Sequence, residues 1–221
     1  PARLTAILNA LRTAAFAALK WQDAPPATIE QLTRIHTPAY IDRVFARVPK
    51  HGYRALDGDT ILSPQSGEAA LRAAGAVCAA IDAVLRQEAS NAFCAIRPPG
   101  HHAEPSQAMG FCLFNNVALG PAHARVIHGL ERVAVIDFDV HHGNGTQVAF
   151  EHDPGYLYIS THQSHIYPGT GHRDELGVGN IINVPLLAGS DSTDLRHAWW
   201  QDIEPALHQF RPQLILISAG F

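Results

Sequence analysis

The residues best suited to chemistry in this 221-residue sequence lie in one stretch, from Val133 to Thr146. Asp137, Asp139 and His141 follow the apolar run Val133–Ile136 at alternate positions. In an extended chain their side chains therefore point the same way, off the end of a buried strand. In open α/β sheets this is the end where ligands bind. Carboxylate oxygen and imidazole nitrogen bind divalent metals, and a catalytic zinc usually has three protein ligands, of which Asp139 and His141 can supply two.

The alternative for this stretch is a strand that ends in a polar surface loop with solvated acids and histidines. We favour the functional interpretation, because two carboxylates beside the pair His141 and His142 are costly to bury without partners. Gly143 and Gly145 allow a sharp turn afterwards, and Thr146 is a candidate cap for the helix that follows.

A second histidine pair, His101 and His102, follows another apolar segment, residues 93–96, which we predict to be a buried strand. Two prolines stiffen the approach to the pair, and Gly100 lets the backbone come close, an arrangement that holds imidazoles in fixed positions. A lone histidine at this place would more often be structural. A pair at the end of a second strand favours a site shared with Asp139 and His141.

The elements that must position these residues alternate between apolar strands and helices. We predict strands over residues 93–96, 133–136, 156–161, 181–186 and 214–219, and helices over 4–20, 37–45, 66–86, 116–128 and 192–210, with a short helix capped by Thr28. This alternation predicts an α/β domain with a mostly parallel central sheet flanked by helices. Asp57 and Asp59, in the loop over residues 49–65, could face a site, although solvated loop acids are commoner.

The composition excludes several classes of function. With 47% hydrophobic and 16% charged residues, the chain can bury one sizeable core. A formal net charge of −4 argues against nucleic-acid partners and a membrane surface, which favour a basic face. We expect no membrane span and no signal peptide. Cys78, Cys94 and Cys112 lie in apolar contexts and indicate reduced core residues of a cytoplasmic protein. The glycine-rich residues 167–171 lack the lysine and helix of a phosphate cradle, which excludes nucleotide binding.

Five segments together resemble the zinc-dependent histone deacetylase family, which includes bacterial deacetylases and acetylpolyamine amidohydrolases. They are Arg97–His102, Gly110–Asn116, Asp137–Thr146, Tyr167–Gly171 and Ser218–Phe221. The resemblance covers essentially the whole chain, in order. Asn144 stands where one branch of the family has aspartate, so the chain is more similar to the class II branch.

The resemblance implies a three-layer arginase/deacetylase-like α/β fold and hydrolysis of an N-acetyl amide on a lysine or another amine. Carried over position by position, it implies that Asp139 and His141 bind one Zn²⁺ ion. The metal would polarise the acetyl carbonyl and lower the pKa of a bound water to about 7. Gly110, Phe111 and Tyr167 would line a narrow tunnel for the aliphatic arm of the substrate.

The resemblance also implies roles for the other polar residues. His102 would be the general base and then the acid, and His101 its electrostatic partner. Asp137 would accept a hydrogen bond from His101, and Asn144 would orient His102, as partner groups do in catalytic triads. In similar enzymes a potassium ion, K⁺, is held by the equivalents of Asp137 and Ser160 with the main-chain carbonyls of residues 139 and 141.

Compared with such enzymes, residues 1–221 are expected to form a single catalytic domain that is incomplete at both ends. The family's third zinc ligand is an aspartate that follows the Gly-x pair resembled by Gly220 and Phe221. Its oxyanion-stabilising tyrosine lies on a later segment, and losing such a donor costs about 10²–10³ in turnover. We therefore expect this chain alone to hold zinc weakly and to be nearly inactive. Uncovered apolar surface could also lead to homo-oligomers.

Two other functions stay open from the sequence. One is a noncatalytic relative that binds acylated ligands, which the intact His101, His102, Asp139 and His141 argue against. The other is a manganese ureohydrolase of similar fold, whose two bridged metals need acids and histidines on several strands. The loops do not reveal whether the substrate is acetyl-lysine, an acetylpolyamine or another acetylated amine. A bacterial cytoplasmic setting is implied by the resemblance alone.

Overall fold

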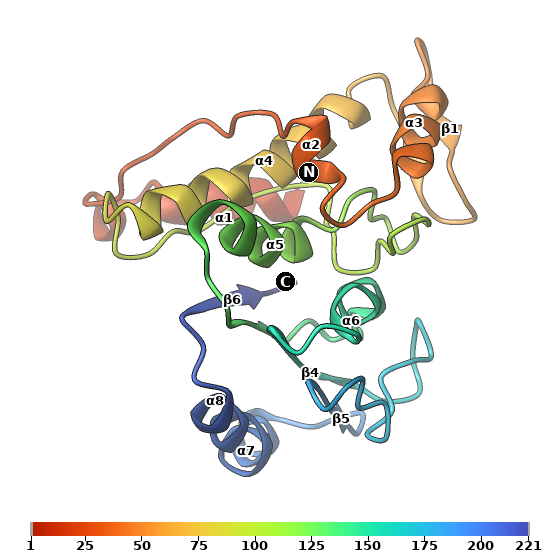
Figure 1. The fold of residues 1–221 in the computed structure, drawn as a ribbon. Helices are drawn as coiled ribbons and strands as arrows, with labels where there is room; N and C mark the ends of the chain where they lie inside the picture. The colour runs from red at the N-terminus through yellow and green to blue at the C-terminus, as the bar shows by residue number, and fades with distance from the viewer. Residues whose placement is uncertain (1, 221) are drawn as a thin grey trace.

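The computed structural model describes residues 2–220, which form the helices and two sheets shown in Figure 1. The main sheet has four parallel strands in the order β5-β4-β3-β6, which are β3 (Val133–Asp137), β4 (Tyr156–Gln163), β5 (Ile181–Leu186) and β6 (Leu214–Ser218). Strands β1 (Arg54–Ala55) and β2 (Ile61–Leu62) form a separate antiparallel pair. The helices are α1 (Ala2–Leu11), η1 (Ala14–Phe16), α2 (Ile29–Leu32), α3 (Pro38–Arg47), α4 (Ser66–Leu85), α5 (Asn116–His128), α6 (Asn144–Phe150), α7 (Ser192–Ala198), the π-helix η2 (Trp199–Ile203) and α8 (Glu204–Phe210).

Helices cover the main sheet on both faces, so this part of the fold has three layers (Figure 1). On one face α4 packs against α5, and α5 lies on β3 and β6. On the other face Ile203 and Phe210 of the α7-η2-α8 segment pack against Ile136 and Leu157. The predicted α/β class, with a parallel sheet between helices, is confirmed.

Gly120 lets α5 lie close to the sheet. A Cβ atom at this position would come within 2.6 Å of Leu216 Cδ2 in β6 and within 2.9 Å of Ile81 Cδ1 in α4. A larger residue would push the two layers apart, because protein interiors are close-packed. At the start of α5, the Asn115 side chain accepts a hydrogen bond from the amide of Ala118 and caps the helix. Helix α5, which follows the His101-His102 loop, is therefore fixed by its packing at Gly120 and by its cap at Asn115.

A row of polar side chains crosses the carboxyl end of the main sheet. Strand β3 is buried at all five positions and yet ends in Asp137. The register places Asp137 beside Ser160 of β4 and Ser218 of β6, and Ser160 beside Asn183 of β5. Because the strands are parallel, the loops that follow them leave from this same edge. The row therefore lies where the sequence predicts the site.

The predicted strand over residues 93–96 is wrong. No strand among residues 2–220 pairs with this segment. Phe93 is exposed, whereas Cys94 and Ile96 pack against the cluster that contains Val77 and Ile81 of α4. The alternation of these side chains is therefore that of an extended segment lying over a helix.

Several predicted helices are confirmed, with corrected ends. Thr28 caps α2 through a capping box, as predicted. The first helix stops at Leu11 instead of residue 20, and none of its residues is buried. Thr146 lies inside α6 instead of capping it. The predicted helix over 192–210 is interrupted by η2, just before Pro205, which has no amide hydrogen to donate to the preceding turn.

The cysteines agree with the prediction of core residues. Cys78, Cys94 and Cys112 are free thiols that are buried or partly buried. Strand β6 is at the edge of the described sheet, and its Ile217 is 64% exposed. Within residues 2–220, no helix is both long and apolar enough to cross a bilayer.

His36 joins the N-terminal helices to the loop that carries His101 and His102. Its Nδ1 donates to the carbonyl of Glu104 (3.0 Å), and its Nε2 accepts from the amide of Asn115 (2.9 Å). Protonation of Nε2 would replace this acceptor with a second donor. Burial lowers the pKa of His36 to about 4, while the bond to Glu104 acts in the opposite direction.

This pKa predicts acid sensitivity. The unfolded chain takes up a proton on His36 near pH 6.5, but the folded protein does so only near pH 4. The free energy of unfolding therefore falls as the pH drops from about 6.5 to about 4, by up to about 3 kcal/mol from this residue. Urea unfolding at several pH values will show a weaker pH dependence for His36→Gln than for the wild type. The exposed His51→Gln serves as the control, and equal pH dependence in both variants would contradict this role.

Candidate active site

Asp137 is the buried centre of the polar residues at the end of β3. Its Oδ2 accepts hydrogen bonds from His101 Nδ1 (2.9 Å) and the Tyr158 hydroxyl (3.3 Å), and its Oδ1 accepts one from the amide of Asp139 (3.1 Å). Burial alone raises the pKa of Asp137, but the charge and hydrogen bond of His101 outweigh it and hold that pKa low. Burial likewise opposes charge on His101, but Asp137 raises the pKa of His101 overall. The two side chains thus form a buried ion pair.

His102 lies next to this pair in a different protonation state. Its Nδ1 donates to Oδ1 of Asn144 (2.9 Å), which leaves Nε2 with a free lone pair. The amide of Asn144 is oriented by Glu104, whose Oε1 accepts from Nδ2 of Asn144 (2.9 Å). Burial, together with the charge of His101, lowers the pKa of His102 to about 4. His102 is therefore a neutral base with a defined tautomer at neutral pH.

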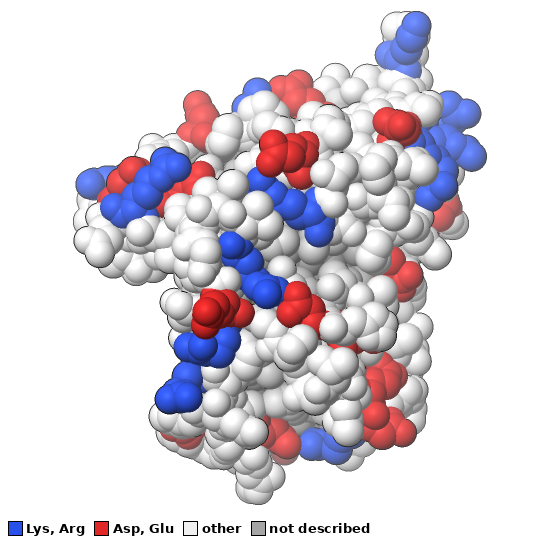
Figure 2. Space-filling view, in the orientation of Figure 1, with Lys and Arg blue, Asp and Glu red and all other residues white. Residues whose placement is uncertain are grey.

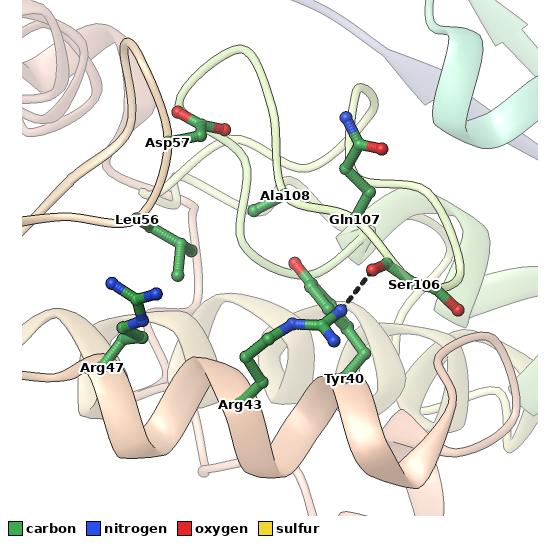
Figure 3. Close-up of a pocket in the computed structure, with 8 residues that line it drawn as sticks. All are labelled: Tyr40, Arg43, Arg47, Leu56, Asp57, Ser106, Gln107 and Ala108. Carbon is green, nitrogen blue, oxygen red and sulfur yellow. Dashed lines mark hydrogen bonds between the residues drawn. The ribbon is translucent and has the colours of Figure 1, made fainter.

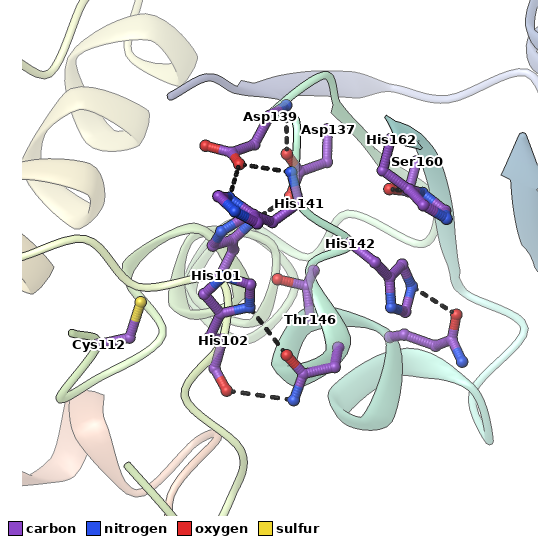
Figure 4. A network of polar contacts seen from close by, with 12 residues as sticks. His101, His102, Cys112, Asp137, Asp139, His141, His142, Thr146, Ser160 and His162 are labelled. Atoms are coloured by element: carbon purple, nitrogen blue, oxygen red, sulfur yellow. Dashed lines mark hydrogen bonds and ion pairs between the residues drawn. The ribbon is translucent and has the colours of Figure 1, made fainter. Parts of the chain in front are cut away.

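Asp139 and His141 lie side by side in the loop after β3 (Figure 4). Oδ1 of Asp139 accepts from the amide of His141 (2.8 Å) and lies 3.1 Å from its Nδ1. The His141 side chain is 41% exposed and that of Asp139 is 17% exposed. A Cβ at residue 220 would fall only 1.6 Å from Oδ2 of Asp139, so only Gly220 fits where the chain leaves β6. A carboxylate and an imidazole are thus presented together at a partly open position.

The Tyr167 ring stands beside these histidines, and Phe111 follows Gly110 in the loop that approaches His102. The Tyr167 ring is edge-on to His102, with ring centroids 5.1 Å apart, and lies 6.2 Å from His141. The Phe111 side chain is exposed, and its amide donates to Oγ1 of Thr60 (3.2 Å). Gly110 has a φ of +57°, and a Cβ there would come within 2.3 Å of His102 Cδ2. Only glycine therefore lets this loop approach the base.

The remaining predicted residue, Ser160, lies beside Asp137 in the register of β3 and β4. Its hydroxyl is 2.9 Å from Nδ1 of His162, whose Nε2 donates to the carbonyl of Gly171. The structure thus brings the predicted polar residues, Gly110 and Tyr167 together, whereas the recorded contact of Phe111 is that of its amide with Thr60.

Sequence reasoning missed a polar network behind His141. His142 is buried, with Nδ1 2.8 Å from the Thr170 hydroxyl and Nε2 3.0 Å from Oε1 of Gln147. Gln147 donates to Glu175 (2.6 Å), and Glu175 accepts from the amide of Gly171. This network fixes the loop that carries Tyr167. The pairing of His142 with His141 was a signal for it, but no spacing in the sequence indicated Glu175.

A second group of metal-type ligands lies away from this site, between α4 and α5. Oδ1 of Asp82 lies 2.8 Å from Nε2 of His123 and 2.7 Å from Nε2 of His128. Arg34 Nη1 lies 2.6 Å from Nδ1 of His123 and can only donate, so the His123 proton must be on Nε2, the atom that a metal would need. Arg86 adds a second positive charge near Asp82. We interpret this group as a hydrogen-bonded link between the helices.

Comparison with known proteins finds similarity to histone deacetylases. Residues 1–221 match the family profile described as histone deacetylase domain. The histone deacetylase-like amidohydrolase of Pseudomonas aeruginosa is 45% identical over 210 residues, which are 93% of this chain and 55% of that protein. The polyamine deacetylase HDAC10 of Homo sapiens is 38% identical over 237 residues, which are 100% of this chain and 35% of that protein.

A solved structure agrees with these relatives. The crystal structure of the HDA15 HD domain is similar with a TM-score of 0.95 and 37% sequence identity, over 100% of this chain and 67% of that one. The chain spans 55% and 35% of the two curated relatives above, so their full length extends well beyond the matched part.

The tautomer of His102 can be measured directly. We expect ¹⁵N spectra of the histidine side chains to show His102 protonated on Nδ1 only and neutral down to about pH 4, because Asn144 accepts from Nδ1 and burial opposes charge. In Asn144→Ala this preference for Nδ1 should weaken. The exposed His208 is the internal control. A His102 signal with the proton on Nε2 would contradict its assignment as a free base.

Proposed function

This chain belongs to the histone deacetylase family, and we propose that it takes part in the zinc-dependent hydrolysis of an N-acetyl amide on a lysine or another amine, with release of acetate. The observation that supports this most is the free Nε2 of His102 beside the carboxylate and imidazole of Asp139 and His141. An acid–base group next to a pair of metal-type ligands is what metal-assisted amide hydrolysis requires.

The two donors fit zinc in kind. Asp139 and His141 offer an oxygen and a nitrogen ligand from one loop, partly open to solvent, and among residues 2–220 no arginine or lysine is paired with either. A catalytic zinc usually takes three protein ligands. Residues 2–220 supply these two, and no third histidine, cysteine or acid of that part joins them within ligand distance. When bound there, zinc would polarise the acetyl carbonyl and lower the pKa of a water.

His102 transfers the protons in this proposal, and Asn144, Glu104 and His101 set its orientation and its electrostatic environment. Nε2 of His102 accepts the proton of the attacking water and returns it to the leaving amine, as a base that then acts as an acid. Asn144, oriented by Glu104, keeps the Nε2 lone pair directed away from its own hydrogen bond. The ring centroids of His101 and His102 are 4.0 Å apart. The positive charge of His101 therefore lies close enough to stabilise negative charge that develops on the substrate.

The aromatic residues account for binding of the aliphatic arm. Phe111 and Tyr167 have large, exposed rings; the Tyr167 ring is edge-on to His102, and Phe111 directly follows Gly110, which lies against His102. Such rings would cover the methylene groups of an acetyl-lysine or an acetylpolyamine and keep water away from the reacting amide. Gly110 allows the loop that carries Phe111 to approach His102.

Further parts of the proposal concern ions and setting. We assign a K⁺ ion to the region of Asp137 and Ser160, with the main-chain carbonyls of residues 139 and 141, since a buried carboxylate and a hydroxyl adjoin there. The exposed edge strand β6 would support association into homo-oligomers. A cytoplasmic setting is in accord with the three free thiols.

Zinc binding distinguishes the two groups of ligands. We expect Asp139→Asn to weaken zinc binding at least tenfold, because the carboxylate ligand loses its charge. Asp82→Asn should leave zinc affinity unchanged while lowering the unfolding free energy by about 1–3 kcal/mol, since a neutral amide oxygen replaces the charged acceptor of two hydrogen bonds from histidines. Competition with a chromogenic chelator measures the affinity. Loss of zinc binding in Asp82→Asn instead would show that the metal binds at Asp82, His123 and His128 and would contradict the assignment to Asp139 and His141.

Acetate release tests the role of His102. The assay uses a protein that also carries the third zinc ligand and the oxyanion-stabilising tyrosine expected from the resemblance. With zinc and an acetyl-lysine peptide, we expect His102→Gln in that protein to reduce turnover by about 10²–10⁴, the usual contribution of a general acid–base group. Zinc affinity should change little, because His102 is not one of the proposed ligands. His51→Gln is the matched control at an exposed position. Turnover in His102→Gln equal to that of the wild type would refute the proposed mechanism.

A further inference from the structure

A hollow lies on the outer side of the loop that joins His102 to Gly110. It has a volume of about 340 Å³ and is bounded by α3 on one side, by residues 106–108 on the second and by Leu56 and Asp57 on the third (Figure 3). Its volume is in the range of small-ligand pockets. The inner side of the same loop contacts the base through Gly110, so the hollow and the candidate active site share one wall.

The side from α3 carries two arginines, and both point into the hollow (Figure 3). Arg43 donates to the carbonyl of Ser106 (2.6 Å), and its guanidinium lies over the Tyr40 ring at 5.4 Å. These contacts hold the group in place and leave further N–H donors free. Arg47 lies one turn later, and its guanidinium has no hydrogen bond or ion pair with any residue of 2–220. Two like charges four residues apart on a helix repel each other unless an anion lies between them.

The surrounding charges favour an anion on the α3 side. Residues 43–54 contain four basic residues and no acidic one, in a chain with a net charge of −4. Figure 2 shows Lys and Arg side chains gathered at the corner where α3 and β1 lie. The one carboxylate in the hollow, Asp57, is already bound, because its Oδ1 accepts from the amides of Asp59 (3.1 Å) and Thr60 (2.7 Å). It stands opposite the arginines without neutralising them.

The hollow is also connected to the opening above His102. Asp57 holds the amide of Thr60, and the Thr60 hydroxyl accepts from the amide of Phe111, a wall of the proposed tunnel. On the other side, Ala108 is two residues from Gly110. These contacts join the wall of the hollow to the loop that carries Gly110 and Phe111.

We propose that this hollow is a subsite for one anionic group, a carboxylate or phosphate on the substrate, held by Arg43 and Arg47. The inference rests on the proposed function, since the group is carried by the acylated substrate. It favours acidic acetyl-lysine peptides over acetylpolyamines, whose charges are positive. Asp57 on the opposite wall confines the anion to the α3 side.

The test is equilibrium binding of two fluorescein-labelled peptides, one with glutamate and one with glutamine on both sides of acetyl-lysine. At low ionic strength we expect the acidic peptide to bind about three- to tenfold more tightly, as two partly exposed ion pairs would give. Arg47→Gln should reduce this ratio to near one and leave binding of the neutral peptide unchanged. Arg54→Gln, an exposed arginine of the same corner outside the hollow, should keep the ratio.

Two outcomes would overturn the subsite. One is equal affinity of the wild type for both peptides, or no binding of either, and the other is an equal loss of preference in Arg54→Gln and Arg47→Gln. Inorganic phosphate should displace the acidic peptide selectively, whereas equal displacement of both peptides would also overturn it. Unacetylated versions separate this inference from the proposed function. A preference for glutamate without any gain from the acetyl group would retain the subsite and argue against the deacetylase.

Discussion

The buried pair of Asp137 and His101 is the interaction on which the rest of the site depends. A fully buried carboxylate is tolerated only where its charge is balanced and its oxygens accept hydrogen bonds. Asp137 meets both conditions through His101, Tyr158 and the amide of Asp139. The same contacts fix the start of the loop after β3 and the position of the first histidine in the pair. A positive charge is thereby held beside His102, which helps to keep that base neutral.

A second set of contacts, made by the loop of residues 103–110, connects His102 to the N-terminal helices. Residues 103–110 contact His102 and Asn144 on their inner side, where Glu104 orients Asn144 and Gly110 lies against His102. On the outer side the backbone of the same loop accepts hydrogen bonds from His36 and from Arg43. The loop that positions the base is therefore supported by the N-terminal helices, far from it in the sequence. This explains why a histidine with no chemical role, His36, is buried with both ring nitrogens bonded.

The sequence predicted most of the fold because its strongest patterns are local. The β-branched run before Asp137 and the small-residue face of α4 depend on neighbours along the chain, and both were located correctly. The segment over 93–96 has the same apolar character as a strand, but pairing is a long-range property that its residues do not encode. Thr146 does not cap α6, because the helix begins before it at Asn144. Its hydroxyl instead accepts a hydrogen bond from Asn115, the capping residue of α5, which is a long-range contact. The paired histidines and alternate acids predicted residues that the structure brings together, whereas Glu104 and Glu175, which hydrogen-bond to this group, have no pattern of their own.

We propose that Asp139 and His141 hold a metal beside a neutral His102. Anomalous diffraction at the zinc edge, from crystals of this chain equilibrated with zinc, would locate that metal. We expect one strong peak between the Asp139 carboxylate and the His141 ring, on the side that faces His102. A peak instead at Asp82, His123 and His128, or none near Asp139, would contradict it.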